Sequence, residues 1–99
     1  MKINNQEIDI ASYIKETLNN ETAFYNEENQ KIIVLNSTAT TIWNIIEKSY
    51  AEQVDICTDD IVDRIKQAYD VNETENYVLV NDVEEAIQLL YDSALLKKI

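Results

Sequence analysis

The spacing of apolar residues changes at Leu35, and this change constrains the fold more than any other feature of the chain. Before Leu35, apolar and polar residues alternate with the period of two that is typical of half-buried strands. After Leu35, apolar residues recur every three to four positions, as on the buried face of a helix. The pattern therefore predicts an α+β chain in which a sheet is followed by helices.

Three strands are predicted in the first part of the chain, over residues 8–17, 21–25 and 31–35. Asn19-Asn20 is expected to turn the chain between the first two strands, and the polar residues 26–29 form a hairpin-length connection to the third. Because consecutive strands joined by short turns pair side by side, the sheet is expected to be antiparallel. Residues before Ile8 carry few apolar side chains, so residues 1–7 are expected to form a flexible N-terminal tail.

Three helices are predicted after the sheet. The first begins at Asn36 or Ser37, either of which can act as an N-cap, and the second begins at Thr58, whose hydroxyl can cap. The third and longest runs from Asn72, which has capping-box spacing to Glu75, to about Ser93. A three-stranded antiparallel sheet followed by three helices is winged-helix-like, with residues 8–99 as a single domain.

Composition supports a small protein of one domain in a reducing compartment. The chain has 99 residues, of which 45% are apolar, enough for one modest core. No apolar stretch approaches the length of a membrane span, and no signal peptide is evident. Cys57 is the single cysteine, so an internal disulfide is impossible. These features predict a cytoplasmic protein with no membrane contact.

The charge of the chain is strongly negative and unevenly distributed. The formal net charge is -11, and 12 of the 19 acidic residues fall in residues 51–99. Such a surface repels phosphate backbones, so nucleic-acid binding is disfavoured even though winged-helix folds often bind DNA. The acidic half serves either simple solubility or attraction to a basic partner.

Catalytic and metal-binding patterns are absent from the sequence. The chain contains no His and no Gly, and its one Cys has no base nearby in sequence. The acidic clusters 59–63 and 82–85 are explained as solvated helix faces, and calcium-loop spacing is missing. The sequence therefore predicts a protein that is not an enzyme and needs no cofactor or metal.

The third predicted strand is apolar on both faces. Ile32, Ile33, Val34 and Leu35 follow one another without a polar residue. One interpretation is an ordinary strand that the rest of the chain covers on both sides. The other is an open sheet edge, at which an extended peptide pairs with the main chain of residues 31–35.

Two aliphatic residues of the third predicted helix fall outside its apolar stripe. Val78 and Leu89 lie on a face formed otherwise by Asp82, Glu85 and Asp92 when the helix is plotted at 100° per residue. They are either scattered surface residues, which are common, or part of the wall of a groove.

The run from Lys31 to Trp43 resembles the signature of PqqD-like proteins, in which a strand ends in Leu-Asn and leads through Thr-Ala to a helical Ile-Trp. In this chain the signature reads Leu35-Asn36-x-Thr38-Ala39-x-x-Ile42-Trp43. Weaker likenesses follow in order at Thr58 to Val62, Tyr69 to Val71, Asp82-Val83 and Leu89 to Leu96. The chain departs from the family in lacking the usual glycines and in the segment 72–81, which is longer and leaves the register of the last helix open.

The resemblance implies a peptide chaperone, or recognition element, that binds the leader of a ribosomally synthesised precursor peptide. The leader would add as a strand beside Lys31, Ile32, Ile33, Val34 and Leu35. The opposing wall would come from Val78, Asp82, Glu85 and Leu89, with the flank of Tyr77, Glu84 and Gln88 as the alternative. The bound precursor would be presented to a modifying enzyme, often a radical SAM enzyme in this family.

Charge alone supports a different function, that of an acidic inhibitor or regulator that occupies the basic cleft of a nucleic-acid-binding protein. The oligomeric state stays open between a monomer and a homodimer paired through its sheet edges.

Overall fold

Two small sheets and three helices make up the part of the chain that the computed structural model describes, residues 1–19, 21–69 and 76–99. The strands in chain order are β1 (Lys2–Ile3), β2 (Gln6–Ile10), β3 (Tyr13–Leu18), β4 (Glu21–Asn26), β5 (Lys31–Leu35) and β6 (Leu96–Lys98). The helices are α1 (Ser37–Glu52), α2 (Thr58–Tyr69) and α3 (Asn76–Asp92). The predicted α+β class, with an antiparallel sheet followed by three helices, is confirmed.

The predicted three-stranded sheet is present in the order β3-β4-β5, and both pairs are antiparallel. The turn between β4 and β5 is closed by Asn26, whose Oδ1 accepts a hydrogen bond from the backbone N–H of Glu28 at 2.9 Å. Gln30 ends this turn with a φ of 62°. Because the chain contains no glycine, such left-handed turn positions are taken by other residues, four of them in the N-terminal third: Asn4, Asn5, Asn19 and Gln30.

A second sheet, in the order β1-β2-β6, was not predicted. It contradicts the expected tail at residues 1–7, because Ile3 is 1% exposed in the core and Lys2–Ile3 pairs with β2. Asn4, in the turn between β1 and β2, connects this turn to α2, because its Oδ1 accepts a hydrogen bond from the backbone N–H of Thr58 at 2.8 Å. The N-terminal residues are therefore part of the packed structure.

The single strand predicted over residues 8–17 is also wrong, because the chain changes sheets within it. β2 ends at Ile10 and β3 begins at Tyr13. An uninterrupted strand would place Ile8 and Ile14 on one face. Instead Ile8 is 2% exposed and Ile14 is 61% exposed, so the two belong to different surfaces.

The first helix begins where the sequence predicts. Asn36 is the N-cap of α1, and its Oδ1 accepts a hydrogen bond from the backbone N–H of Ala39 at 2.9 Å. This cap lets the chain pass from β5 into α1 with no intervening loop. The predicted start of the third helix at residues 72–75 lies outside the described residues.

The start of α2 is predicted correctly but its cap is not. Thr58 is the first helical residue, yet its Oγ1 accepts from the Asn4 side chain at 2.9 Å rather than capping the helix. The capping contact runs from Asp60, whose Oδ2 accepts the backbone N–H of Cys57 at 3.0 Å. This hydrogen bond lowers the pKa of Asp60 below its usual value.

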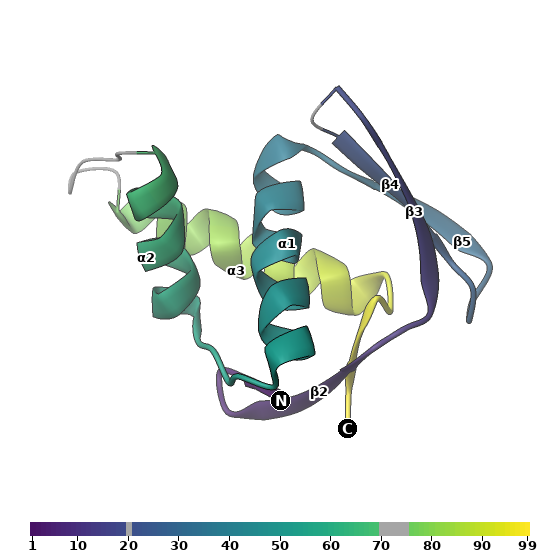
Figure 1. The fold of residues 1–99 in the computed structure, drawn as a ribbon, viewed down its shortest axis with the longest axis horizontal. Coiled ribbons are helices and arrows are strands. Elements are labelled where there is room, and N and C mark those ends of the chain that lie inside the picture. Colours follow the sequence, from purple (N-terminus) through teal and green to yellow (C-terminus); the bar gives the residue numbers. More distant parts are fainter. Residues whose placement is uncertain (20, 70–75) are drawn as a thin grey trace.

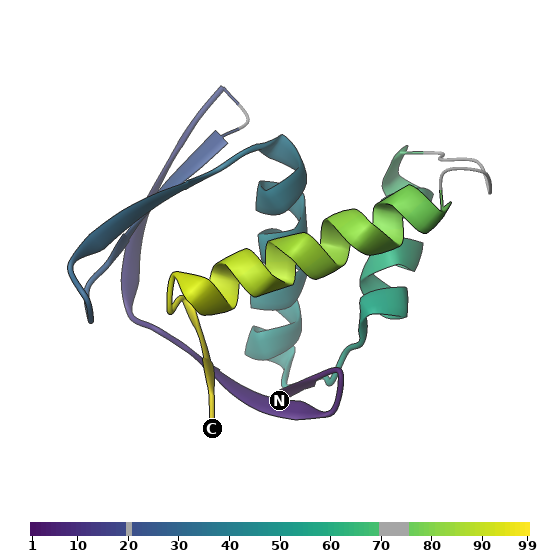
Figure 2. The ribbon, with the colours of Figure 1, turned by 180° about the vertical axis from the view of Figure 1, so that it is seen from behind.

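The helices form a layer against one face of the β3-β4-β5 sheet. Figures 1 and 2 show that α3 runs across α1 and α2, that the sheet lies on the far side of α1 from α2, and that the two termini lie near each other. Tyr13, Phe24 and Trp43 pack edge to face between the sheet and α1, with ring centroids 5.2–5.6 Å apart. No helix within the described ranges has the length and apolar content needed to cross a membrane.

Candidate functional site

The free edge of β5 is the first feature of the candidate site. Within residues 1–19, 21–69 and 76–99, β5 pairs with β4 alone, so the peptide groups on its other side have no strand partner. An edge of this kind presents N–H and C=O groups to any extended chain that reaches it. The condition for strand addition at residues 31–35 is therefore met by the fold.

The side chains of β5 alternate between the helical layer and the outer surface. Leu35 is fully buried and Ile33 is half-buried against the core, whereas Ile32 is 71% exposed and Val34 is 55% exposed. Lys31 is exposed at the start of the strand. The interpretation of β5 as a strand covered on both faces is thus excluded, because the described chain covers only the face toward the helices.

The opposite edge of the same sheet, on β3, has a different character. Its central residues, Lys15 and Glu16, are charged, and charges on an edge strand discourage pairing with another chain. Lys15 forms an ion pair with Glu47 of α1 at 3.1 Å, and the hydroxyl of Tyr13 donates to the same carboxylate. Burial raises the pKa of Glu47. From Ile32 to Leu35, β5 carries no charge, so it is the less protected edge.

A groove runs between the N-terminal turn of α1 and α3, next to the end of β5. It has a volume of about 260 Å³ and is lined by seven residues: Asn36, Thr38, Ala39, Asp82, Glu85, Ala86 and Leu89. Three of the four predicted wall residues, Asp82, Glu85 and Leu89, are therefore brought together along one hollow. Leu89 supplies its large apolar side chain and is 42% exposed.

Small side chains form the floor of the groove. Ala39 of α1 and Ala86 of α3 are nearly buried, and their methyl groups leave space that a larger side chain would fill. The N-cap at Asn36 fixes the position of α1, because it starts the helix directly at the end of β5. The strand edge and the groove are consequently held in one rigid arrangement.

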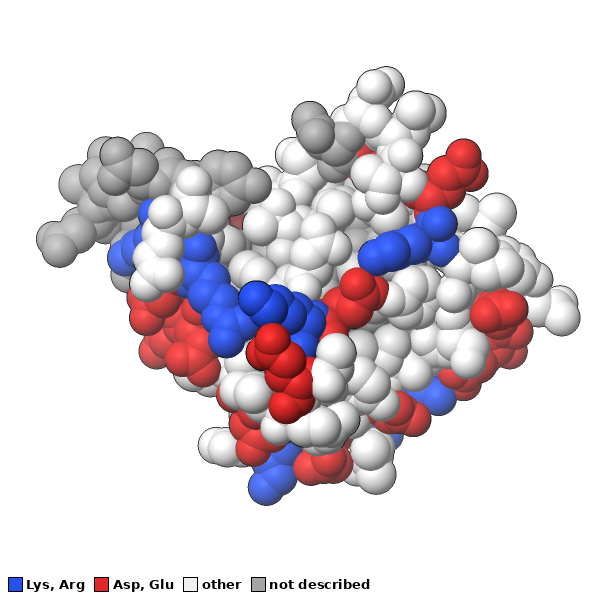
Figure 3. Space-filling view, in the orientation of Figure 1, with Lys and Arg blue, Asp and Glu red and all other residues white. Residues whose placement is uncertain are grey.

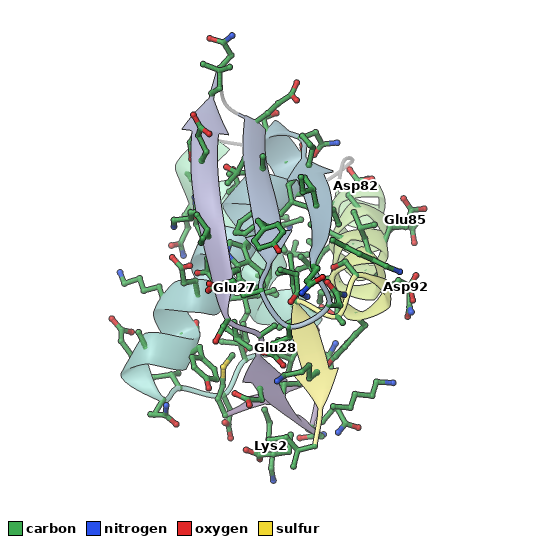
Figure 4. All side chains as sticks on the ribbon, turned by 90° about the vertical axis from the view of Figure 1, so that its right-hand side faces the viewer. Lys2, Glu27, Glu28, Asp82, Glu85 and Asp92 are labelled. Carbon is green, nitrogen blue, oxygen red and sulfur yellow. The ribbon has the colours of Figure 1, made fainter. Side chains whose placement is uncertain are left out.

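The wall on α3 is acidic. Figure 4 shows α3 beside β5 at the free side of the strand, with Asp82, Glu85 and Asp92 projecting from the helix. Neither Asp82 nor Glu85 has an ion-pair or hydrogen-bond partner among the described residues, and Glu85 is exposed. Their charges are therefore available to a basic ligand in the groove.

The alternative flank of α3 does not line this groove. Glu84 and Gln88 are exposed elsewhere on the helix, and the Gln88 side chain donates a hydrogen bond to Asp92 at 2.8 Å. The side chains of Tyr77 and Val78, one from each predicted flank, lie outside the described residues. The groove geometry thus favours Asp82, Glu85 and Leu89 as the wall.

Four groove residues were not predicted as part of the site: Asn36, Thr38, Ala39 and Ala86. Asn36, one of the two predicted N-caps, caps α1, and Ala39 is buried. The sequence pattern does not show that two small residues from different helices, Ala39 and Ala86, lie next to the same groove. Ala39 and Ala86 carry a signal for the groove only when it is known that α1 and α3 pack together.

A second hollow of about 490 Å³ lies between α1 and α2, away from β5. It is lined by Thr41, Asn44, Ile45, Lys48, Glu52 and Arg64. Figure 3 shows basic side chains gathered over α1 and α2 on this face, with acidic side chains below them. Arg64 is held by a hydrogen bond from its Nη1 to the Oγ of Ser49 at 3.1 Å. No sequence pattern singled out this hollow.

The described residues do not assemble a metal-binding cluster. No group of three or more Cys, Asp or Glu side chains in those ranges is placed to hold a metal ion, and the chain has no His. Cys57 is half-buried, and its thiol contacts Asp60 at 3.3 Å. The candidate site combines a free strand edge, a groove with an alanine floor and unpaired carboxylates.

Comparison with known proteins places these features in a family context. The model of the family described as coenzyme PQQ synthesis protein D (PqqD) matches residues 21–96. Among solved structures, the chain resembles TbiB1 in complex with the TbiA(beta) leader peptide, with a TM-score of 0.69 and 18% identity over 90% of this chain and 94% of that chain. No curated protein matches the chain.

Proposed function

Because the chain belongs to the PqqD family, we propose that it binds the leader region of a ribosomally synthesised precursor peptide and presents the peptide to a modifying enzyme. The leader adds as a strand to the free edge of β5 and lies against the acidic wall of α3. Residues 8–99, together with the packed N-terminal residues, act as one peptide-binding domain.

The observation that carries this proposal is the free edge of β5 beside the groove of α1 and α3. Edge pairing supplies main-chain hydrogen bonds with little demand on sequence, and the groove supplies selectivity through side chains. The solved structure with the similar fold is itself a complex with a leader peptide. Lys31, Ile32, Ile33, Val34 and Leu35 would form the pairing edge, and Val78, Asp82, Glu85 and Leu89 the wall.

Main-chain pairing alone is too weak to hold a flexible peptide. Each hydrogen bond contributes about 0.5–1.5 kcal/mol, whereas ordering each peptide residue costs about 1–2 kcal/mol. Apolar leader side chains that enter the groove over Ala39 and Ala86 are therefore needed to make binding favourable. Leu89 is the large apolar side chain that such an anchor would contact.

The chain works by positioning rather than by catalysis. A leader held on β5 keeps the attached core of the precursor close to the enzyme, at an effective concentration in the millimolar range for a short linker. The partner enzyme is proposed to be a radical SAM enzyme, on the strength of the family resemblance. The free chain is proposed to be a monomer or a homodimer paired through β5.

The unpaired carboxylates of the wall motivate a test by calorimetry. The leader of the precursor peptide is expected to bind, and its affinity is expected to fall roughly threefold to thirtyfold between low and high salt. The reason is that each exposed ion pair with Asp82 or Glu85 contributes up to about 1 kcal/mol and is screened by salt.

The matched control is the double variant Asp82→Asn/Glu85→Gln, which keeps the shape of the wall and removes its charge. Its affinity for the leader is expected to be lower at low salt and nearly independent of salt. A parent affinity that does not change with salt would remove the electrostatic part of the proposal. A leader that binds neither parent nor variant under any condition would refute the function itself.

The rival function, an acidic inhibitor of a nucleic-acid-binding protein, is supported by net charge alone. A mimic of nucleic acid needs carboxylates spaced over a broad surface, whereas the described site combines carboxylates with a groove floored by alanines and a free strand edge. Those two features have no role in the rival function, and we therefore prefer leader binding.

A further inference from the structure

The outward face of the β3-β4-β5 sheet carries adjacent apolar side chains that the described residues leave uncovered. In register, Ile14 of β3 lies beside Tyr25 of β4, which lies beside Ile32 of β5. In the next row on this face, Ala23 of β4 lies beside Val34 of β5. We define the outer apolar face as the five large side chains, which are 38–72% exposed: Ile14, Leu18, Tyr25, Ile32 and Val34.

This arrangement departs from that of an ordinary one-sided sheet. When one face of an antiparallel sheet packs on a core, the other normally carries polar side chains. Single exposed apolar residues are common on protein surfaces, but a contiguous group on the order of several hundred Å² marks an interaction surface. The outer apolar face is therefore a surface that a partner covers.

The charges around the face indicate the chemistry of that partner. On this face Glu16 lies between Ile14 and Leu18 of β3, and Glu21 lies opposite Leu18, so acidic side chains are set into the β3 side of the face. Glu27 projects from the hairpin at its lower end (Figure 4). Two copies of a chain with a net charge of -11 repel each other, as do this chain and an anionic lipid surface. A protein surface with an apolar centre and Lys or Arg at its border is complementary to the face.

The face is continuous with the edge at which the leader is proposed to bind. Ile32 and Val34 belong to β5, and a strand added to β5 would also alternate its side chains between the two faces of the sheet. The outward side chains of the bound peptide would extend the outer apolar face by one strand. A protein that covers this face therefore contacts the peptide as well.

We propose that the outer apolar face is the docking surface of the peptide-modifying enzyme, whose complementary patch is apolar and bordered by basic side chains. This inference rests on the proposed function, because it assigns the covering partner to the enzyme that receives the leader. It has a thermodynamic consequence: the chain with leader bound holds the enzyme more tightly than the free chain does, since the peptide enlarges the shared surface.

The test uses the double variant Ile14→Thr/Leu18→Thr, which removes apolar surface from β3, the strand farthest from the leader edge. Threonine is β-branched, which strands favour, and it adds no charge. The variant is expected to lose at least tenfold in affinity for the modifying enzyme that acts on the precursor peptide. Its affinity for the leader peptide is expected to stay within twofold of the parent.

Val54→Thr is the control, because Val54 is an exposed aliphatic residue away from the sheet. It is expected to leave both affinities unchanged. The fluorescence of Trp43, the single tryptophan, reports whether each variant keeps its core, since Trp43 is fully buried beneath the sheet.

Enzyme affinity within twofold of the parent for the folded double variant would overturn the inference. In that case sedimentation would identify a second copy as the occupant if the parent dimerises and the variant does not. Cosedimentation of the parent alone with phosphatidylcholine vesicles would identify a lipid surface. A third outcome separates the two proposals. If the parent binds the enzyme but not the leader, and the double variant no longer binds the enzyme, the proposed function is refuted and the docking surface is supported.

Discussion

Leu89→Asn is expected to weaken leader binding by about tenfold to fiftyfold and to leave the fold intact. Leu89 is half-exposed at the wall of the groove, where its side chain is available to an apolar anchor of the leader. Replacing a contact of this size with a neutral amide removes about 1.4–2.3 kcal/mol of binding free energy. Asparagine has a similar shape and no charge, so the change separates apolar contact from the electrostatics of Asp82 and Glu85.

The matched control for this variant is Val54→Asn. Val54 is 43% exposed, close to the 42% of Leu89, and lies outside the groove. Calorimetry with the leader peptide is expected to separate the two variants clearly. If Leu89→Asn binds as tightly as Val54→Asn, Leu89 is not an anchor contact and the leader lies elsewhere on the chain.

Ile3→Ala is expected to destabilise the protein by about 2–4 kcal/mol, a large part of the total stability of a domain this size. Ile3 is 1% exposed within the core, and the backbone of its turn is tied to the start of α2, where the N–H of Asn4 donates to the carbonyl of Ile56 at 3.0 Å. Thermal unfolding is expected to shift downward by roughly 10–20 °C.

Ile99→Ala supplies the comparison for the same chemical change at the opposite end of the chain. Ile99 is 77% exposed, so removing its side chain is expected to alter the unfolding temperature by only about a degree or two. Equal melting temperatures for Ile3→Ala and the parent would mean that residues 1–7 form a tail after all.

The parts of the fold that the sequence predicts well are those with a strong local signal. β5 is confirmed to the residue because the apolar run ends at Leu35, and of the two predicted N-caps of α1, Asn36 and Ser37, the structure has Asn36. β1 and β6 escaped prediction because they have only two and three residues, too few to show a period. Their apolar residues Ile3 and Leu96 are buried through contacts that are remote in sequence.

The closing strand illustrates why such contacts are hidden. β6 pairs with β2, and Lys97 joins two distant acids, Glu28 at 2.8 Å and Asp9 at 3.9 Å. The Lys97 ammonium lowers the pKa of Glu28, and the Tyr50 hydroxyl lowers that of Asp9. None of these partners is within forty positions of Lys97 in the chain. The periodicity of apolar residues cannot predict which of the eight basic side chains pairs with which of the nineteen acidic ones.

The candidate site also has a part that the sequence predicts and a part that it does not. The helical plot placed Leu89 with Asp82 and Glu85 off the core stripe of α3, and the structure gathers these three along the groove. The floor of the groove and the outer apolar face depend on how whole helices and strands pack together. They could therefore not be predicted from the local sequence pattern. Local pattern thus identified the surfaces, and tertiary packing determined which of them face one another.

Amide hydrogen exchange along β5, followed by NMR with and without the leader peptide, tests strand addition most directly. Binding is expected to slow exchange at every second residue of Lys31–Leu35, because alternate N–H groups point away from β4, and to leave β3 unchanged. Slowed exchange along β3 instead, or none along β5 while the peptide is bound, would contradict the account.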